Sequence, residues 1–268
     1  MINRPIQPFS TDSGNGGERI PRRRADRDAL SSNESAHGKR RAVPGRDTAP
    51  TKPGKIKPTK LRIIGGTMGG RSVLYLGDRS TRPMKDSLRE TLFNILGKSI
   101  KGAIAIDLFA GTGVIAIESL SRGAVHSIAI EKSGLAAKTI RSSADNIGIG
   151  SELDVLTGDA FRVAPQLIRD LLIKDLRMKD SPDGVNENPP GSCESPRPHW
   201  VVFFCPPYAM WADATEKLFG LLQLTAELAP KGTQIVLETD KFFDVATLPL
   251  ETWDIRPKGN VTLSFLEI

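Results

Sequence analysis

A hydrophobic run that passes through a glycine turn into a second apolar segment constrains this chain more than any other feature. It reads Ala105-Ile-Asp-Leu-Phe-Ala-Gly-Thr-Gly-Val-Ile-Ala116. A strand–turn–helix unit of this kind marks a ligand site at the carboxyl end of a parallel strand. Gly111 and Gly113 would let the backbone approach the ligand, and the helix that begins near Val114 would direct free N–H groups at it.

Strand and helix patterns alternate from Leu61 onward, which predicts an α/β fold: a Rossmann-like, mostly parallel sheet with helices on both faces. The expected strands of this sheet are Ala103–Leu108, Ser127–Glu131, Leu153–Leu156, Trp200–Phe204, Gln234–Glu238, Thr252–Ile255 and Val261–Glu267. The expected helices between them are Val114–Ser121, Leu135–Asn146, Phe161–Lys174 and Ala212–Leu228. Because the last two strands are joined by a short Pro- and Gly-containing connection, one edge of the sheet should be antiparallel.

The predicted sheet forms one domain, 61–268, which opens with a small glycine-rich hairpin over 61–80. An amphipathic helix follows, and its Ser87-Leu-Arg-Glu90 segment has the form of a capping box. Residues 174–199 are rich in Pro, Gly and Ser, so we interpret them as a loop insertion within the domain.

The first 60 residues carry 14 Lys and Arg against 6 Asp and Glu, whereas the rest of the chain carries 23 against 25. This segment has one aromatic residue and interleaves its basic residues with Pro, Gly, Ser and Asn, so it cannot bury a core and is predicted to be a disordered basic arm. Either the arm holds nucleic acid through phosphate contacts, or it is a solvated tail or an overcalled start.

Composition also excludes several classes of protein. No apolar run approaches the roughly 18 to 20 residues of a membrane span, and the first ten residues lack the apolar core of a secretory signal. We therefore expect a cytoplasmic protein without a membrane partner. Two cysteines and three histidines, without metal-ligand spacing, predict neither a disulfide scaffold nor a metal site.

The glycine spacing alone does not identify the cofactor, because Gly111-x-Gly113-x-x-Ala116 also satisfies the dinucleotide fingerprint. Glu131 ends the second strand, where it would accept hydrogen bonds from ribose hydroxyls. Two acidic residues favour S-adenosylmethionine. Asp107 would repel a pyrophosphate but attract an ammonium group, and Asp159 would lie near an adenine amino group. The alternative is that Asp107 only forms the turn and Asp159 only caps a helix.

A second informative segment is the apolar strand that ends in Cys205-Pro206-Pro207-Tyr208. Proline donates no hydrogen bond to a sheet, so two prolines hold an extended turn with fixed carbonyls. The ring of Tyr208 offers a flat face on which a base could stack. The alternative is a strand that is simply ended by its prolines.

These segments together resemble the seven-stranded class I S-adenosylmethionine-dependent methyltransferases that modify amino groups. Three upstream segments are similar to the bacterial enzymes that methylate the exocyclic N2 of a guanine in 16S ribosomal RNA: Leu61–Arg71, Arg82-Pro83 and Asp86–Asn94. The resemblance extends over 61–268 without the 174–199 insertion, and it does not include the arm.

The resemblance implies S-adenosylmethionine as cofactor and ribosomal RNA or the small-subunit particle as partner. It implies a cofactor site made of Asp107, Phe109, Ala110, Gly111, Gly113, Glu131, Asp159 and Ala160. It implies that a flipped-out guanine meets the catalytic segment Cys205, Pro206, Pro207 and Tyr208. It places RNA phosphates at Arg62, Arg71, Arg82 and Arg89, and for Arg89 a solvated helix face is the equal alternative.

Cys205 departs from the family, which has Asp or Asn at this position. A carboxylate there would hold the N–H groups of the guanine amine, and one such group contributes roughly 2.7 to 4 kcal/mol. A thiol is a weak acceptor, whereas a thiolate would accept better but would compete for the methyl group. A cysteine nucleophile, as in pyrimidine C5 methyltransferases, fits poorly because there Pro precedes Cys. The resulting hypothesis is slow methyl transfer unless another group supplies the acceptor, which a single-turnover comparison with Cys205→Asp would test.

The sequence thus predicts an RNA methyltransferase, most directly one for guanine N2 of small-subunit ribosomal RNA. The main alternative is a catalytically weak or inactive RNA-binding or ribosome-assembly factor on the same fold, for which Cys205 and the basic arm argue. An NAD(P)-dependent oxidoreductase rests only on the glycine spacing.

Overall fold

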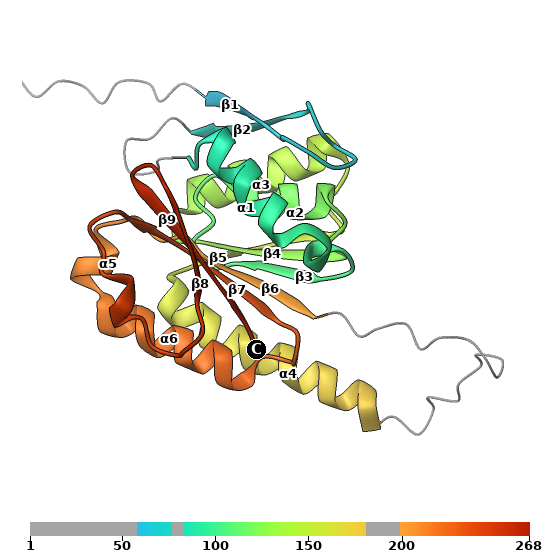
Figure 1. Ribbon diagram of the computed structural model, residues 1–268. Helices are drawn as coiled ribbons and strands as arrows, with labels where there is room; N and C mark the ends of the chain where they lie inside the picture. The colour runs from blue at the N-terminus through green and yellow to red at the C-terminus, as the bar shows by residue number, and fades with distance from the viewer. Residues whose placement is uncertain (1–57, 77–82, 181–198) are drawn as a thin grey trace, which may run out of the picture. The chain divides into compact units, whose positions relative to one another are not determined.

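The computed structural model describes residues 58–76, 83–180 and 199–268 (Figure 1). Their strands are β1 (Pro58–Arg62), β2 (Ser72–Leu76), β3 (Ile104–Asp107), β4 (His126–Glu131), β5 (Leu153–Thr157), β6 (Trp200–Phe204), β7 (Gln234–Asp240), β8 (Asp254–Lys258) and β9 (Val261–Glu267). Their α-helices are α1 (Asp86–Leu96), α2 (Val114–Ser121), α3 (Gly134–Ile147), α4 (Ala160–Asp180), α5 (Met210–Asp213) and α6 (Thr215–Leu228), with short 3₁₀ turns at Gly97–Ile100 and Val245–Thr247.

Seven strands form one sheet in the order β5-β4-β3-β6-β7-β9-β8. The strands β3 to β7 pair in parallel, and β9 pairs antiparallel with both β7 and β8. The predicted α/β class is therefore confirmed. Strand β9 runs opposite to the other six strands and lies between β7 and β8, whereas the edge strand β8 runs in the same direction as β3 to β7. The antiparallel pairings therefore lie at this edge of the sheet, as expected.

Alternate residues of the central strands feed two different cores. Val202 and Phe204 of β6 pack with α4 and α6, whereas Val201 and Phe203 pack with α1 and α2. Figure 1 shows the corresponding layers, with α1, α2 and α3 on one face of the sheet and α4, α5 and α6 on the other. Both faces of β6 are covered by helices, so each of its side chains is buried, which explains the uninterrupted apolar sequence of this strand.

The glycine-rich hairpin pairs β1 with β2 and packs on α2 and α3. Its turn lies at the carboxyl end of α2, where the N–H of Thr67 donates to the carbonyl of Ser121 at 2.7 Å. Its open end, which contains Thr59 and Tyr75, lies beside α3 at the opposite end of the strands. The hairpin therefore reaches from one end of the helical layer to the other.

Several predicted boundaries are wrong in informative ways. Pro58–Lys60, assigned to the arm, are part of β1, and the rest of the predicted arm lies outside the described residues. Helix α4 continues to Asp180, so the insertion cannot begin at Lys174; its remainder is described only at His199. The predicted helix 212–228 is two helices, interrupted at Ala214. Helix α1 begins at Asp86 without a side-chain cap, so Ser87 forms no capping box.

Within the described ranges, no helix has both the length and the apolar character needed to cross a membrane.

Candidate functional site

Parallel pairing brings the carboxyl ends of β3 to β7 to one edge of the sheet, and the chemically distinctive residues gather there. Asp107 is the last residue of β3 and pairs with Ala129 of β4 and Phe203 of β6. Glu131 ends β4, and Asp159 follows β5 by two residues. In open α/β sheets, ligands bind in the crevice outside this edge.

Asp107 is the most unusual side chain of the site. It is 1% exposed, and neither carboxylate oxygen has a hydrogen-bond partner among the described residues. The pKa of Asp107 is raised to about 7, mainly by burial; the N–H of Phe109 opposes the rise, and the negative charge of Glu131 contributes a smaller part of it. A buried carboxyl group without a partner costs free energy in the folded protein, so it is a candidate for a cationic ligand group.

The glycine turn that follows β3 is tied to Glu131. The N–H of Gly111 donates to Glu131 Oε2 at 2.7 Å, and the N–H of Ser133 donates to Glu131 Oε1 at the same distance. Gly111 and Gly113 have φ values of 51° and 72°, a conformation that favours glycine. The carboxylate of Glu131 therefore already orders the turn, and a ribose there would share or replace these N–H contacts.

Asp159 acts as the N-cap of α4. Its Oδ1 accepts a hydrogen bond from the N–H of Phe161 at 3.0 Å, and its Oδ2 accepts one from Lys132 Nζ at 3.0 Å. The bond to Lys132 is the main cause of the lowered pKa of Asp159, so this carboxylate is charged at neutral pH. The capping role considered in the sequence analysis is thus present, and it leaves Asp159 at the edge of the site. Phe109 and Phe161 make an edge-to-face contact there, with ring centroids 6.0 Å apart.

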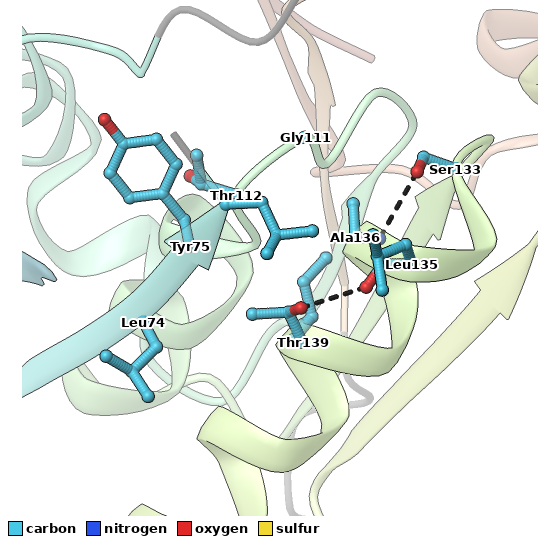
Figure 2. A pocket seen from close by; sticks show the side chains of 10 residues that line it. Leu74, Tyr75, Gly111, Thr112, Ser133, Leu135, Ala136 and Thr139 are labelled. Carbon is cyan, nitrogen blue, oxygen red and sulfur yellow. Dashed lines mark hydrogen bonds between the residues drawn. The ribbon is translucent and has the colours of Figure 1, made fainter. Parts of the chain in front are cut away.

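A pocket lies between β2, the glycine turn and the first half of α3 (Figure 2). It contains about 460 Å³ of empty space, part of which is open to solvent, and none of its lining residues is charged. Figure 2 shows Tyr75 of β2 and Thr139 of α3 on either side of Thr112. The lining residues are Leu74, Tyr75, Leu76, Gly111, Thr112, Ser133, Leu135, Ala136, Thr139 and Ile140. Arg62 and Arg71 were the hairpin residues predicted from the sequence to contact a ligand, and neither lines this pocket, because only tertiary packing brings the open end of the hairpin to the turn.

The Cys205-Pro-Pro-Tyr segment leaves β6 at the same edge as Asp107. Burial raises the pKa of the Cys205 thiol well above its ordinary value, and the charges of Glu238 and Asp107 raise it further. The thiolate considered in the sequence analysis is therefore disfavoured. Tyr208 Oη donates to Glu238 Oε1 at 2.6 Å, which holds the tyrosine ring against the end of β7.

Glu238 was missed as a site residue, although the sequence contains a signal. It is the single acidic residue in the apolar run Gln234–Glu238, and it falls where β7 reaches the carboxyl edge of the sheet. The sequence analysis interpreted that run only as a strand.

The three predicted RNA-contacting arginines that the structure describes do not gather at the site. Arg89 is completely buried, and its Nε donates to Glu118 Oε2 at 2.6 Å, so its assignment to RNA phosphate is corrected to a structural role. Arg71 is exposed but donates to the carbonyl of Ile147, at the far end of α3 from the glycine turn. Arg62 is exposed near the same end of the hairpin, and Arg82 lies outside the described residues.

Comparisons with known proteins agree with this fold. Residues 61–173 match the family described as "Conserved hypothetical protein 95". The chain is 36% identical over 106 residues, 40% of its length, to ribosomal RNA small subunit methyltransferase D of Buchnera aphidicola. It is 41% identical over 80 residues, 30% of its length, to the protein of that name from Escherichia coli. The alignments cover only 40% to 55% of the length of the first curated relatives.

A solved structure from Thermus thermophilus, hypothetical protein TTHA0928, is 25% identical with a TM-score of 0.55, and the match covers 78% of this chain and 99% of that chain. The Escherichia coli structure yhhF is 23% identical, also with a TM-score of 0.55, over 77% of this chain and 97% of that chain. These matches and the strand order establish the Rossmann-like, seven-stranded class I methyltransferase fold.

Proposed function

We propose that this protein, whose residues 61–173 match the Conserved hypothetical protein 95 family, is an S-adenosylmethionine-dependent methyltransferase that acts on small-subunit ribosomal RNA. Two relatives, 36% and 41% identical over 106 and 80 residues, are named ribosomal RNA small subunit methyltransferase D. We further infer the exocyclic N2 of a guanine as the methylated atom, because the Pro-Pro-Tyr segment is the one in which the chain resembles amino-group methyltransferases. A ribosomal substrate would place the protein in the cytoplasm.

The observation that carries the proposal is the buried carboxyl group of Asp107, which has no hydrogen-bond partner among the described residues and ends the strand that leads into the glycine turn. This carboxylate fits the ammonium group of the methionine moiety. The carboxylate of Glu131 fits the ribose hydroxyls, and the N-capping Asp159 would accept a hydrogen bond from an adenine amino group. When bound, S-adenosylmethionine supplies an electrophilic methyl group on a sulfonium.

The residues of the chain would then orient the two reactants. Asp107 and the turn would hold the donor at the end of β3, while Pro206, Pro207 and Tyr208 would hold an extruded guanine at the end of β6. Since β3 and β6 are adjacent strands, the two groups would face each other across one strand spacing. Such positioning is a large part of catalysis for an in-line displacement.

Two measurements test this function. Calorimetry should detect binding of S-adenosylmethionine to the parent, and Asp107→Asn should weaken that binding at least tenfold because the ammonium loses its counter-charge. Digestion of small-subunit RNA after incubation with labelled donor should yield labelled N2-methylguanosine. Binding without any transfer would favour the second candidate, a non-catalytic RNA-binding factor, for which the thiol at Cys205 argues. Absence of donor binding would refute the enzymatic function.

A further inference from the structure

Glu238 is a buried carboxylate that has no role in the proposed function described above. Its strand β7 lies beside β6, and Leu237 pairs with Phe204, so Glu238 lies level with Cys205 at the end of the sheet. The residue is only 8% exposed. Removing a carboxylate from water costs several kcal/mol unless partners compensate, so a core residue of this kind requires an explanation.

Two contacts fix Glu238 against the proposed base-binding segment. Its Oε1 accepts the hydrogen bond from Tyr208 Oη at 2.6 Å, and its backbone carbonyl accepts one from Trp211 Nε1 at 2.9 Å. The Trp211 ring in turn packs on Phe243, with centroids 4.8 Å apart. The carboxylate is therefore held at the hydroxyl end of the Tyr208 ring, on whose face the base would stack.

The charge of Glu238 also acts on the position that lacks a carboxylate. It is one of the two charges that raise the pKa of the Cys205 thiol. The thiol thus stays protonated and remains a weak acceptor, whereas a carboxylate lies close enough to influence it.

We propose that Glu238 is the catalytic carboxylate of the target-base site and accepts the hydrogen bond from the guanine amine that Cys205 cannot hold. This inference rests on the proposed function. A carboxylate offers about four lone-pair sites, so the bond from Tyr208 does not by itself exhaust it. As the amine nitrogen bonds to the methyl carbon, the carbon–sulfur bond breaks and its electron pair stays on sulfur. The nitrogen then loses one proton, which passes to the Glu238 carboxylate and on to water.

Four variants of the full-length protein test this role by single-turnover transfer to small-subunit RNA at saturating donor. Glu238→Gln keeps the size of the side chain but removes its charge. Tyr208→Phe removes the hydroxyl and keeps the carboxylate. Glu238→Gln combined with Cys205→Asp moves the carboxylate to the neighbouring strand. Glu267→Gln is the matched control, because Glu267 lies at the opposite end of the β7–β9 pair and is exposed.

We expect Glu238→Gln to slow transfer about 100- to 1000-fold, with donor affinity within twofold of the parent. Tyr208→Phe should lose less than Glu238→Gln, the double variant should recover at least tenfold over Glu238→Gln, and Glu267→Gln should match the parent. If Glu238→Gln does not keep the melting temperature of the parent, Glu238→Asp is used in its place. The aspartate retains the negative charge, but its carboxylate lies one methylene farther from the base site. The same rate loss is then expected.

Three results would overturn the inference: a Glu238→Gln rate within threefold of the parent, equal losses in Glu238→Gln and Tyr208→Phe, or no recovery in the double variant. Equal losses would mean that Glu238 only positions the tyrosine ring. A parent that transfers no methyl group would instead refute the proposed function, so the two failures are distinguishable.

Discussion

Individual side chains in this protein depart from the usual rule that charged groups stay in water. Asp107, Glu118 and Arg89 are each at most 1% exposed. Arg89 and Glu118 compensate each other as an ion pair, and Arg122 adds a second cation at 2.9 Å from Glu118. Asp107 has no such compensation. This difference separates the structural ion pair from a carboxyl group that is a candidate for binding a ligand.

The raised pKa of Asp107 predicts a pH-dependent cost in stability. The folded protein holds the proton more tightly than the unfolded chain, whose carboxyl group has the ordinary value of 3.8. Stability is therefore lost as the pH rises from about 4 to about 7, and the loss is complete above that range. The loss in the free energy of unfolding amounts to about 4 kcal/mol for a pKa shift of this size.

Asp107→Asn has no charge to bury, so it should be more stable than the parent at pH 8 and gain little at pH 4. Urea unfolding at both pH values measures this; an equal difference at both would contradict it.

The buried ion pair predicts that Arg89 supports the fold. Arg89→Met should lower the free energy of unfolding by about 3 to 5 kcal/mol, because it leaves Glu118 with less compensation inside the core. The exposed Arg162→Ala serves as a control and should change stability by about 0.5 kcal/mol or less. Chemical denaturation compares the two variants. A loss of RNA affinity without a loss of stability in Arg89→Met would restore the original assignment to RNA.

At the scale of elements, the turn between β3 and α2 both lines the pocket and packs against the neighbouring helix α3. The N–H of Gly113 donates to the carbonyl of Ala110 at 2.7 Å, which closes the turn before α2 begins. A Cβ atom added at Gly113 would lie 2.6 Å from Ile140 Cγ2 of α3. The second glycine of the motif is therefore required by packing as well as by its positive φ.

Gly113→Ala is expected to destabilise the protein by about 1 to 3 kcal/mol, through left-handed strain and overpacking against Ile140. Gly220→Ala is a sharp control, since Gly220 is exposed within α6 and a Cβ there meets nothing within 4 Å. That control should instead stabilise the helix by about 0.5 to 1 kcal/mol. Thermal unfolding of both variants distinguishes the effects, and an unchanged melting temperature in Gly113→Ala would show that the turn can shift.

At the scale of the whole molecule, charge is divided unevenly along the chain. The first 60 residues carry an excess of basic residues, while the remainder has slightly more acidic than basic residues. With Arg89 buried and Arg71 held at the far end of α3, neither of these two described arginines offers the predicted phosphate contact near the site. This distribution favours the first interpretation of the arm given above, in which it holds nucleic acid through phosphate contacts.

Replacing Arg22, Arg23 and Arg24 together with serine should weaken RNA binding and flatten its salt dependence. Each lost phosphate contact lowers the slope of log K against log salt concentration by about 0.7 to 0.9. The control replaces the exposed Lys98 and Lys101, which precede β3 at the amino end of the sheet, and should leave the slope unchanged. Filter binding at several salt concentrations gives both slopes. Equal slopes in the parent and the arginine variant would favour a solvated tail.

The sequence by itself determined the order of elements and the carboxyl edge of the sheet. Helix α2 and strands β6 and β9 were predicted with their observed bounds, because apolar periodicity and glycine turns act within a few residues. The same local patterns placed Asp107, Glu131 and Cys205 at strand ends. Parallel pairing of those strands then brings the three residues to one edge of the sheet.

Only the tertiary structure decided which charges face inward and which segments meet. Arg89 and Glu118 are separated by 29 residues and Tyr208 and Glu238 by 30, and no local window contains either pair. The hairpin likewise carries Tyr75 to the pocket and Arg71 away from it. Such contacts depend on how amphipathic faces pack against one another, and that packing is a property of the whole core.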